Sequence, residues 1–363
     1  MQPKSLNILV SPLDWGLGHA SRCIPIINQL LKAGHKVTLA GSGRSLILLQ
    51  KEFPSLESLD LRSFSPTFSS SGNTIIHLIL LLPDFIRSIY REHRELKDLI
   101  SRNHFDVILS DNRYGLWNKK VQSILITHQV MIKTPSWLRF AEYLIYRISR
   151  LMIGYFDECW IPDYKESPGL SGDLSHKYPK PGNARFIGPL SRFQQEENSF
   201  EKIPGDEKIT AIISGPEPQR GIFEDILTKQ LAAANQQSTI ITGKPESEIT
   251  IVTNGNLTIA PHLSVREMSS VINSSSLVIC RSGYSSIMDL QALGAKALFV
   301  PTPGQTEQIY LAELHQKSGT ALWQAQEALN LEVDIGKAME YAGFKKNTTE
   351  SGISSAIADL KKK

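Results

Sequence analysis

The amino-acid sequence predicts an α/β protein made of two Rossmann-like domains that face each other across a cleft. Short apolar segments typical of buried parallel strands alternate with amphipathic helical segments along the chain. Between residues 162 and 206 this alternation stops, and Pro, Gly, Ser and charged residues dominate. A chain of 363 residues is long enough for two domains of about 150 to 200 residues each.

The first half carries the pattern expected of one such domain. Strands are expected over 6–11, 36–40, 106–110, 123–127 and 158–161. The intervening helices include 18–33 and 137–153. We therefore predict an N-terminal domain over 1–165, followed by a linker region over 166–206.

The second half repeats the alternation. Strands are expected over 208–213, 238–241, 257–259, 277–280 and 297–300. Helices are expected over 221–234, 264–273, 284–293, 307–317, 324–341 and 351–362. This predicts a C-terminal domain over 207–345, with a terminal helix and basic tail over 346–363.

Charge and cysteine content exclude several classes of protein. The net charge of +3 gives no reason to expect a nucleic-acid partner. The lysines at 361–363 could contact an anionic surface weakly, although a frayed, solvated end is the expected state. Cys23, Cys159 and Cys280 are far apart and form no Cys-x-x-Cys pair. Reduced thiols, a cytoplasmic location and no metal site are therefore expected.

One stretch has the character of a membrane-surface helix. No signal peptide is evident at the start of the chain, and the apolar run over 75–82 is far shorter than the roughly 20 residues that span a bilayer. Basic residues follow this run as far as Lys97. The pattern suits a peripheral contact through 75–97 at the inner face of the cell membrane, and packing into the domain core is the alternative.

The first polar corner follows the first predicted strand and contains Gly16, Gly18 and His19. Glycines allow close backbone approach, and a helix N-terminus favours an anion. Ser21 replaces the third glycine of a dinucleotide fingerprint, and no acidic residue ends the next strand, so a dehydrogenase is not expected. His19 has the chemistry of a base near neutral pH, although a capping or solvated histidine is the alternative.

Two further corners lie in the second half. The turn over 214–221 contains Arg220 and opens a helix, which suits a phosphate or an ordinary rigid loop. Ser282 and Gly283 begin another predicted helix. Asp289 lies about two helical turns beyond Ser282 in an otherwise apolar window. Its carboxylate could accept hydrogen bonds from a ribose diol, and a surface aspartate is the alternative.

These residues resemble glycosyltransferase family 28, a group with the GT-B fold that includes the peptidoglycan N-acetylglucosaminyltransferase. The resemblance rests on CRSG over 280–283, on Asp289, on FVP over 299–301, on Gln308, and on Gly-His after the first strand. Segments over 110–115, 127–129 and 188–192 are similar to a less characterised branch of GT-B transferases.

The resemblance implies that the second domain binds a nucleotide sugar and the first binds the acceptor. It assigns uracil to the loop at His262 and Leu263, ribose to Asp289, and donor sugar hydroxyls to Glu307 and Gln308. The diphosphate is assigned to the following residues: Arg192, Gly215, Gln219, Arg220, Arg281, Ser282 and Gly283. The family's phosphate loop and paired glutamines are altered here, so the identity of the sugar does not carry over.

The implied reaction moves a hexose or N-acetylhexosamine from a UDP-linked donor to an acceptor hydroxyl, with inversion and without a metal or cofactor. His19 is the expected base, and Asp111 is expected to orient it, with Asp14 as a competing carboxylate. The loop at Gly16 and Gly18 would face phosphate or acceptor. The acceptor could be lipid-linked or a cell-envelope glycan. A UDP-sugar epimerase of the same fold and a non-catalytic nucleotide-sugar-binding protein are the alternatives.

Overall fold

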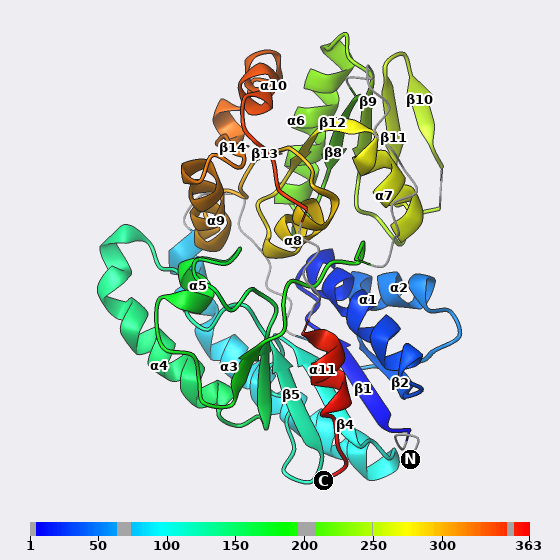
Figure 1. The fold of residues 1–363 in the computed structure, drawn as a ribbon, viewed down its shortest axis with the longest axis vertical. Coiled ribbons are helices and arrows are strands. Elements are labelled where there is room, and N and C mark those ends of the chain that lie inside the picture. Colours follow the sequence, from blue (N-terminus) through cyan, green and yellow to red (C-terminus); the bar gives the residue numbers. More distant parts are fainter. Residues whose placement is uncertain (1–4, 64–73, 195–207, 249, 347–351) are drawn as a thin grey trace. The chain divides into compact units, whose positions relative to one another are not determined.

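The computed structural model describes residues 5–63, 74–194, 208–248, 250–346 and 352–363, and divides the chain into two units (Figure 1). Unit 1 comprises the described residues of Met1–Pro66, Leu78–Leu190 and Thr349–Lys363. Unit 2 comprises those of Thr67–His77 and Ser191–Thr348. Each unit contains a seven-stranded sheet. The predicted α/β architecture of two Rossmann-like domains is confirmed.

The sheet of unit 1 is parallel throughout, in the order β3-β2-β1-β4-β5-β6-β7. Its strands are β1 (Asn7–Pro12), β2 (Lys36–Gly41), β3 (Glu57–Asp60), β4 (Val107–Asp111), β5 (Gln122–Ile126), β6 (Glu158–Ile161) and β7 (Ala184–Phe186). Every residue of β4 and β5 is buried. Burial on both faces explains why these strands read as almost continuous apolar runs.

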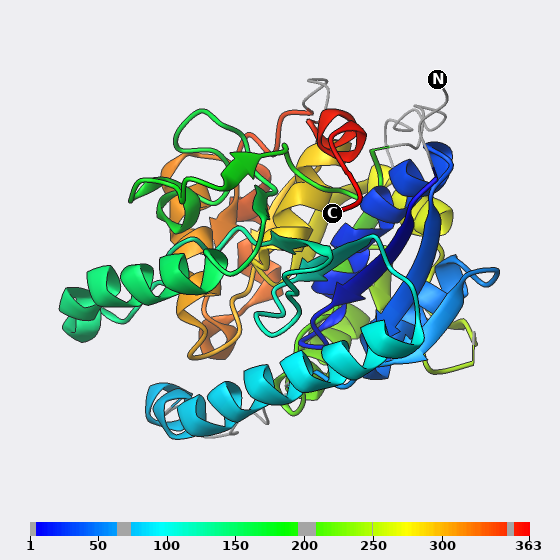
Figure 2. The same cartoon turned by 90° about the horizontal axis from the view of Figure 1, so that it is seen from below.

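Helices pack around this sheet. They are α1 (Leu17–Lys32), α2 (Gly43–Glu52), α3 (Thr74–Arg102), η1 (Ser136–Ala141), α4 (Glu142–Ile153), α5 (Asp173–His176) and α11 (Ile353–Ala358). Figure 2 shows the long helix α3 alongside the strands. Leu96 of α3 packs with Leu9 of β1 and Ile108 of β4 in one apolar cluster. The C-terminal part of α3 is therefore a core helix.

Unit 2 has the same design with one antiparallel edge. The strand order is β10-β11-β9-β8-β12-β13-β14, and only the β10–β11 pair is antiparallel. The strands are β8 (Lys208–Ile212), β9 (Ser238–Ile241), β10 (Val252–Asn254), β11 (Leu257–Ala260), β12 (Ser275–Cys280), β13 (Ala297–Phe299) and β14 (Leu322–Trp323). The helical elements are α6 (Gln219–Ala233), α7 (Val265–Asn273), α8 (Tyr284–Leu293), α9 (Thr306–Lys317), η2 (Gln326–Ala328) and α10 (Leu331–Met339).

The boundaries of unit 1 differ from those expected. The Pro- and Gly-rich region expected as a linker contributes β7, which pairs with β6 and extends the unit to Leu190. The terminal helix α11 also belongs to unit 1, where Arg185 Nη1 donates to Asp359 Oδ2 at 2.6 Å. Composition could not reveal either contact, because both depend on partners far away in the chain.

Two local expectations also differ. In place of the helix expected over 324–341, the structure has the short η2 and the shorter helix α10. The basic tail, expected to be solvated, contacts unit 1: Lys362 Nζ lies 3.3 Å from Asp106 Oδ1, and Lys363 Nζ lies 2.6 Å from Asp157 Oδ1. The two lysines pair with carboxylates that are far away in the sequence and close in the fold.

The structure describes only part of the segment predicted to contact a membrane. Among the described residues, none of the helices offers an apolar stretch sufficient to cross a bilayer. The segment 75–97 lies within α3, and the side chains of 75–82 lie outside the described residues. Further along, Glu92 is buried and pairs with Arg113 at 3.0 Å, whereas Tyr90 is exposed. Peripheral contact through 75–97 stays a prediction.

Candidate active site

The candidate active site of unit 1 lies where its strand order reverses. His19 is in the first turn of α1, directly after β1, and Asp111 is the last residue of β4. Strands β1 and β4 are neighbours, with Pro12 opposite Asp111. Connections leave β1 and β4 toward opposite sides of the sheet, so this point is the switch at which open α/β sheets bind ligands.

His19 and Asp111 are in direct contact. His19 Nδ1 lies 2.6 Å from Asp111 Oδ1. Nδ1 also lies 2.9 Å from Arg22 Nη2, which can only donate. We assign the proton to Nδ1 because its contact with the carboxylate, which can only accept, is the shorter of the two. The other ring nitrogen, Nε2, is then an acceptor. This is the tautomer that a general base requires.

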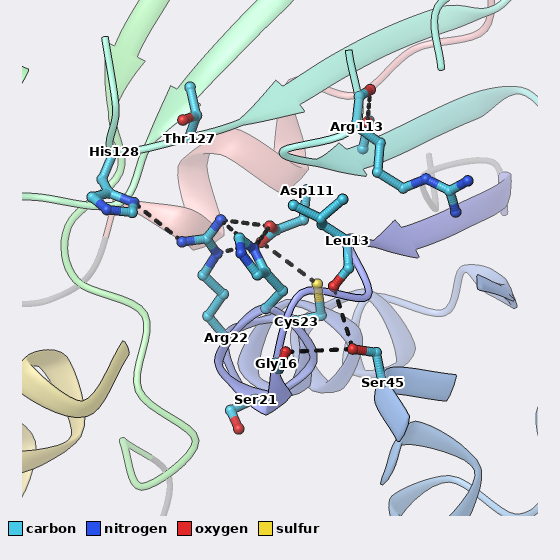
Figure 3. Close-up of polar contacts among 12 residues, drawn as sticks. Leu13, Gly16, Ser21, Arg22, Cys23, Ser45, Asp111, Arg113, Thr127 and His128 are labelled. Atoms are coloured by element: carbon cyan, nitrogen blue, oxygen red, sulfur yellow. Dashed lines mark hydrogen bonds and ion pairs between the residues drawn. The ribbon is translucent and has the colours of Figure 1, made fainter. Parts of the chain in front are cut away.

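Arg22 completes the cluster from the next turn of α1. Its guanidinium forms two hydrogen bonds with Asp111, through Nε to Oδ2 and Nη2 to Oδ1. Its Nη1 lies 3.2 Å from His128 Nδ1. Figure 3 shows the guanidinium between Asp111 and His128. Asp111, Arg22 and His128 are all buried, so the cluster is held away from water.

Burial and charge set the protonation states of the pair. Burial, followed by the positive charge of Arg22, lowers the pKa of His19 below its ordinary value. Burial opposes ionisation of Asp111, but Arg22 and His19 outweigh it and the pKa of that carboxyl is lowered. At neutral pH the site therefore holds a neutral imidazole beside an ionised carboxylate. This is the state in which His19 can accept a proton.

Asp14, the competing carboxylate, contacts the start of α2. Its Oδ1 accepts from the backbone N of Ser45 at 3.3 Å, at the start of α2. A Cβ at Gly43 would lie 2.1 Å from Asp14 Oδ2, and Gly43 has φ +57°, so glycine is required beside this carboxylate. The carboxylate that contacts His19 is thus Asp111, and Asp14 binds the N-terminus of α2.

The loop at Gly16 and Gly18 joins β1 to α1. Gly16 is the N-cap residue, with φ 102° and no side-chain cap. The first N–H groups of α1 are therefore oriented without a capping side chain, as an anion or polar ligand would require. Gly18 lies in the first turn of the helix. The roles predicted for both glycines stay predictions.

In unit 2, predicted donor residues gather at the carboxyl edge of the sheet. Gly215 follows β8, Ser282 and Gly283 follow β12, and the segment leading to Glu307 and Gln308 follows β13. These three strands are neighbours. Helices α6, α8 and α9 begin at this edge, and none of their N-cap residues makes a side-chain cap. At the first turn of α6, Glu217 Oε2 accepts from the backbone N of Gly221 at 3.1 Å. The N-terminal N–H groups and dipoles of these helices favour a negatively charged ligand.

Thr302 stands out at this edge, and the sequence prediction did not include it. Its Oγ1 is buried and has no hydrogen-bond partner within the described parts of the chain. A Cβ added at Gly215 would lie 3.8 Å from this hydroxyl. The backbone N of Thr302 donates to Gln308 Oε1 at 2.7 Å, and Ser282 Oγ donates to the Gln308 carbonyl at 2.7 Å. An orphaned donor beside an open glycine suits a ligand oxygen.

Asp289 faces the segment before the second sheet. Its Oδ1 accepts from Ser191 Oγ at 2.7 Å, and its Oδ2 accepts from Arg192 Nε at 3.2 Å. Burial raises the pKa of this carboxyl, and Arg192 and Ser191 oppose the shift. The structure therefore joins two predicted donor residues, Asp289 and Arg192, and adds Ser191. Their contacts with ribose and phosphate stay predictions.

Two predicted phosphate ligands have partners within unit 2. Arg281 is buried, lies 3.9 Å from the ring centroid of Phe223, and donates to the carbonyls of Val300, Pro301 and Gln219. Burial lowers its pKa to about 9. Arg220 is buried between the carboxylates of Glu217 and Glu224. Both guanidinium groups help to hold the edge together, and their contacts with diphosphate stay predictions.

The remaining predicted donor residues lie on the same unit. His262 and Leu263 connect β11 to α7, and Leu263 is buried. Gln219 is the first residue of α6, and its Oε1 accepts from Gln326 Nε2 at 3.2 Å. Glu307 is in the first turn of α9. Over the described ranges, no His, Cys, Asp and Glu side chains group as a metal site would require.

Comparisons with known proteins indicate a glycosyltransferase. Residues 221–362 match the glycosyltransferase family 28 C-terminal domain. An uncharacterized glycosyltransferase of Methanosarcina mazei is 25% identical over 333 residues, covering 86% of this chain and 85% of the relative. The UDP-N-acetylglucosamine–N-acetylmuramyl-(pentapeptide) pyrophosphoryl-undecaprenol N-acetylglucosamine transferase of Desulforudis audaxviator is 39% identical over 70 residues, or 19% of this chain and 18% of that one.

Solved structures give the same fold. The crystal structure of the kitacinnamycin glycosyltransferase superposes with a TM-score of 0.62 at 13% identity, covering 99% of this chain and 94% of that one. Its fold is GT-B, two parallel-sheet α/β domains, as in the two units described above. The chain is therefore a glycosyltransferase with the GT-B fold, and its residues 221–362 match the model of the glycosyltransferase family 28 C-terminal domain.

Proposed function

We propose that this glycosyltransferase moves a hexose or N-acetylhexosamine from a UDP-linked donor to an acceptor hydroxyl, with inversion and without a metal ion or cofactor. The observation that carries the proposal is the His19–Asp111 contact at 2.6 Å on the switch point of unit 1. It supplies a neutral imidazole, oriented by a carboxylate, at a position where a ligand would bind.

In the proposed reaction, Nε2 of His19 takes the proton of the acceptor hydroxyl. The acceptor oxygen attacks the anomeric carbon, the bond from that carbon to the diphosphate oxygen breaks, and UDP leaves with the bonding electron pair. Asp111 stabilises the imidazolium that forms. A single displacement of this kind inverts the anomeric configuration.

The carboxyl edge of unit 2 supports a diphosphate leaving group. The starts of α6, α8 and α9 place partial positive charge at this edge, and Thr302 adds an unpartnered hydroxyl. These groups would stabilise the developing negative charge without a cation. The UDP assignment is supported by the Desulforudis relative, whose name includes UDP-N-acetylglucosamine.

The acceptor is proposed to be lipid-linked or a cell-envelope glycan. The name of the same relative includes a pyrophosphoryl-undecaprenol acceptor, which is lipid-linked. A cytoplasmic protein with a peripheral contact through 75–97 would fit such an acceptor. Replacing Leu80 and Leu81 by charged residues tests that segment. Loss of membrane flotation with the fold preserved would support the contact.

One assay tests the reaction class. Purified protein is incubated with a panel of nucleotide sugars, with and without a membrane extract, and nucleotide release is followed in the presence and absence of EDTA. Acceptor-dependent release of UDP that survives EDTA supports the proposal. Acceptor-independent sugar conversion would indicate the epimerase, binding without turnover would indicate the non-catalytic protein, and recovery of lost activity by magnesium would refute metal independence. The comparisons do not favour either alternative.

The pH profile tests the protonation state of His19. Activity requires the neutral imidazole, so kcat/KM should fall as the pH falls through the pKa of His19. That pKa is lowered from 6.5 by burial and by Arg22. We expect the acidic limb of the profile to have its midpoint below 6.5. A midpoint above this value would contradict the proposed base.

Thr302 provides a test of the donor edge. Replacing it by valine removes the orphaned hydroxyl at nearly constant volume, whereas serine retains the hydroxyl. A hydrogen bond to a charged oxygen contributes about 1.5 to 3 kcal/mol, so Thr302→Val should raise the donor KM about 10- to 100-fold. Thr302→Ser should stay close to the wild type. Equal donor KM values in all three proteins would exclude this hydroxyl from donor binding.

A further inference from the structure

An exposed apolar face runs along η1 and α4 of unit 1. Its large side chains are exposed to solvent, with Phe140 at 81% and Leu151 at 71%. The members of this face are Trp137, Phe140, Tyr143, Leu144, Ile148, Leu151 and Tyr155. Leu144, Ile148 and Leu151 follow one another in α4 at helical spacings of four and three residues, and Tyr155 lies two residues beyond the helix, with its ring stacked on Trp117. Leu144, Ile148 and Leu151 therefore form one continuous stripe.

The opposite side of α4 already has its partners. Tyr146 and Ile153 belong to an apolar cluster of unit 1 that also contains Val130 and Phe156. Tyr146 Oη donates to the Pro179 carbonyl at 2.8 Å. The helix is thus apolar on both sides, although only one side packs in the fold. An apolar stripe of this extent on a surface helix marks an interaction site.

The charges around the stripe identify its partner. Arg139, Arg147 and Arg150 are exposed on the same segment. The segment's one carboxylate among residues 137–155, Glu142, is buried and pairs with Lys177. The exposed side therefore presents apolar groups bordered by positive charge alone. Such a surface is complementary to an anionic lipid bilayer, where apolar side chains enter the interface and arginines meet the headgroups.

The distribution of side chains along the stripe also fits a bilayer interface. Trp137 and Tyr155 stand at its two ends, and Leu144, Ile148 and Leu151 lie between them. Tryptophan and tyrosine prefer the headgroup level, whereas aliphatic side chains prefer the acyl region. In both views α4 lies at the periphery of unit 1 (Figures 1 and 2). A second copy of the chain is a poorer partner, since a symmetric contact would bring like charges together.

We propose that this face of η1 and α4 docks the protein on the surface of an anionic phospholipid bilayer. The face consists of residues other than 75–97, and the proposal requires no particular donor or acceptor. Binding is driven by burial of the apolar stripe and strengthened by the three arginines. It should therefore weaken with salt, as expected for attraction to anionic headgroups.

Flotation of the full chain with lipid vesicles tests the proposal without measuring turnover. The wild type should float with vesicles of phosphatidylcholine and phosphatidylglycerol, and less with phosphatidylcholine alone. Leu144→Glu/Leu151→Glu should reduce the bound fraction on mixed vesicles about 10- to 100-fold. Arg147→Ala/Arg150→Ala should weaken binding to mixed vesicles about 30-fold, at roughly a tenfold change per 1.4 kcal/mol and about 1 kcal/mol per arginine.

The matched control is Ile251→Glu/Val252→Glu, which changes two exposed apolar residues of unit 2 and should bind as the wild type does. Thermal unfolding of each variant establishes that the fold is retained. The proposal is overturned if the wild type does not bind mixed vesicles, or if Leu144→Glu/Leu151→Glu binds as tightly as the control. It is equally overturned if size-exclusion chromatography shows a dimer that the same double variant abolishes.

Discussion

Replacing His19 by alanine is expected to lower kcat/KM by about 10²- to 10⁴-fold, the usual contribution of a general base. The physical reason is the tautomer that Asp111 enforces, with Nδ1 donating to the carboxylate at 2.6 Å and Nε2 available as the base. The measurement is acceptor-dependent release of nucleotide from the donor identified by the panel assay.

A second histidine on unit 1 provides the control. His104 also pairs with a carboxylate, Asp106, at 3.1 Å, but its side chain is 60% exposed. It lies before β4, at the edge of the sheet opposite Asp111. His104→Ala should leave kcat/KM unchanged, and both variants should keep the thermal stability of the wild type. Wild-type turnover by His19→Ala would remove His19 from the mechanism.

Replacing Asp111 by asparagine is expected to produce two losses at once. The rate should fall by about 10²- to 10⁴-fold, because the tautomer of His19 is no longer enforced and the imidazolium is no longer stabilised. Stability should fall by about 3 to 5 kcal/mol, because the buried guanidinium of Arg22 loses its carboxylate. Kinetic assays are therefore run below the unfolding temperature of the variant, which is measured separately.

The pH profile separates a catalytic effect from a structural one. The Asp111 carboxylate raises the pKa of His19, against the larger effects of burial and Arg22. Asp111→Asn should therefore move the acidic limb of kcat/KM to still lower pH. The double variant His19→Ala/Asp111→Asn should be little slower than either single variant, because residues that act together are not additive. If Asp111→Asn turned over at the wild-type rate while His19→Ala were inactive, Asp111 would not be needed to orient His19. Asp106→Asn serves as the control.

Much of the candidate catalytic site was predictable from strand ends. His19 and Asp111 each follow a buried apolar run, and parallel strands bring such residues to one edge of the sheet. Arg22 was not predictable, because an arginine in an amphipathic helix is usually solvated, and only the fold shows that it is buried against Asp111. His128 likewise becomes part of the cluster only through Arg22.

At the donor edge, the fold shows contacts that residue type alone does not reveal. Arg220 and Arg281 flank polar corners, where an arginine is a reasonable ligand for phosphate. The folded chain brings Glu217 and Glu224 to Arg220 and three backbone carbonyls to Arg281. Thr302 shows the opposite case, because its hydroxyl matters only where the fold leaves it buried and unpartnered.

Four features were predictable from the amino-acid sequence: the α/β class, the two Rossmann-like units, the GT-B resemblance and the polar corners after the strands. Periodicity and strand-end chemistry are local properties, so they can be read in chain order. Three features became apparent only in the fold: Asp111 rather than Asp14 contacts His19, Arg220 and Arg281 have partners within unit 2, and α4 leaves an apolar face exposed. Each of these features depends on contacts between side chains and groups that are distant in the sequence. Such contacts form only when the chain folds.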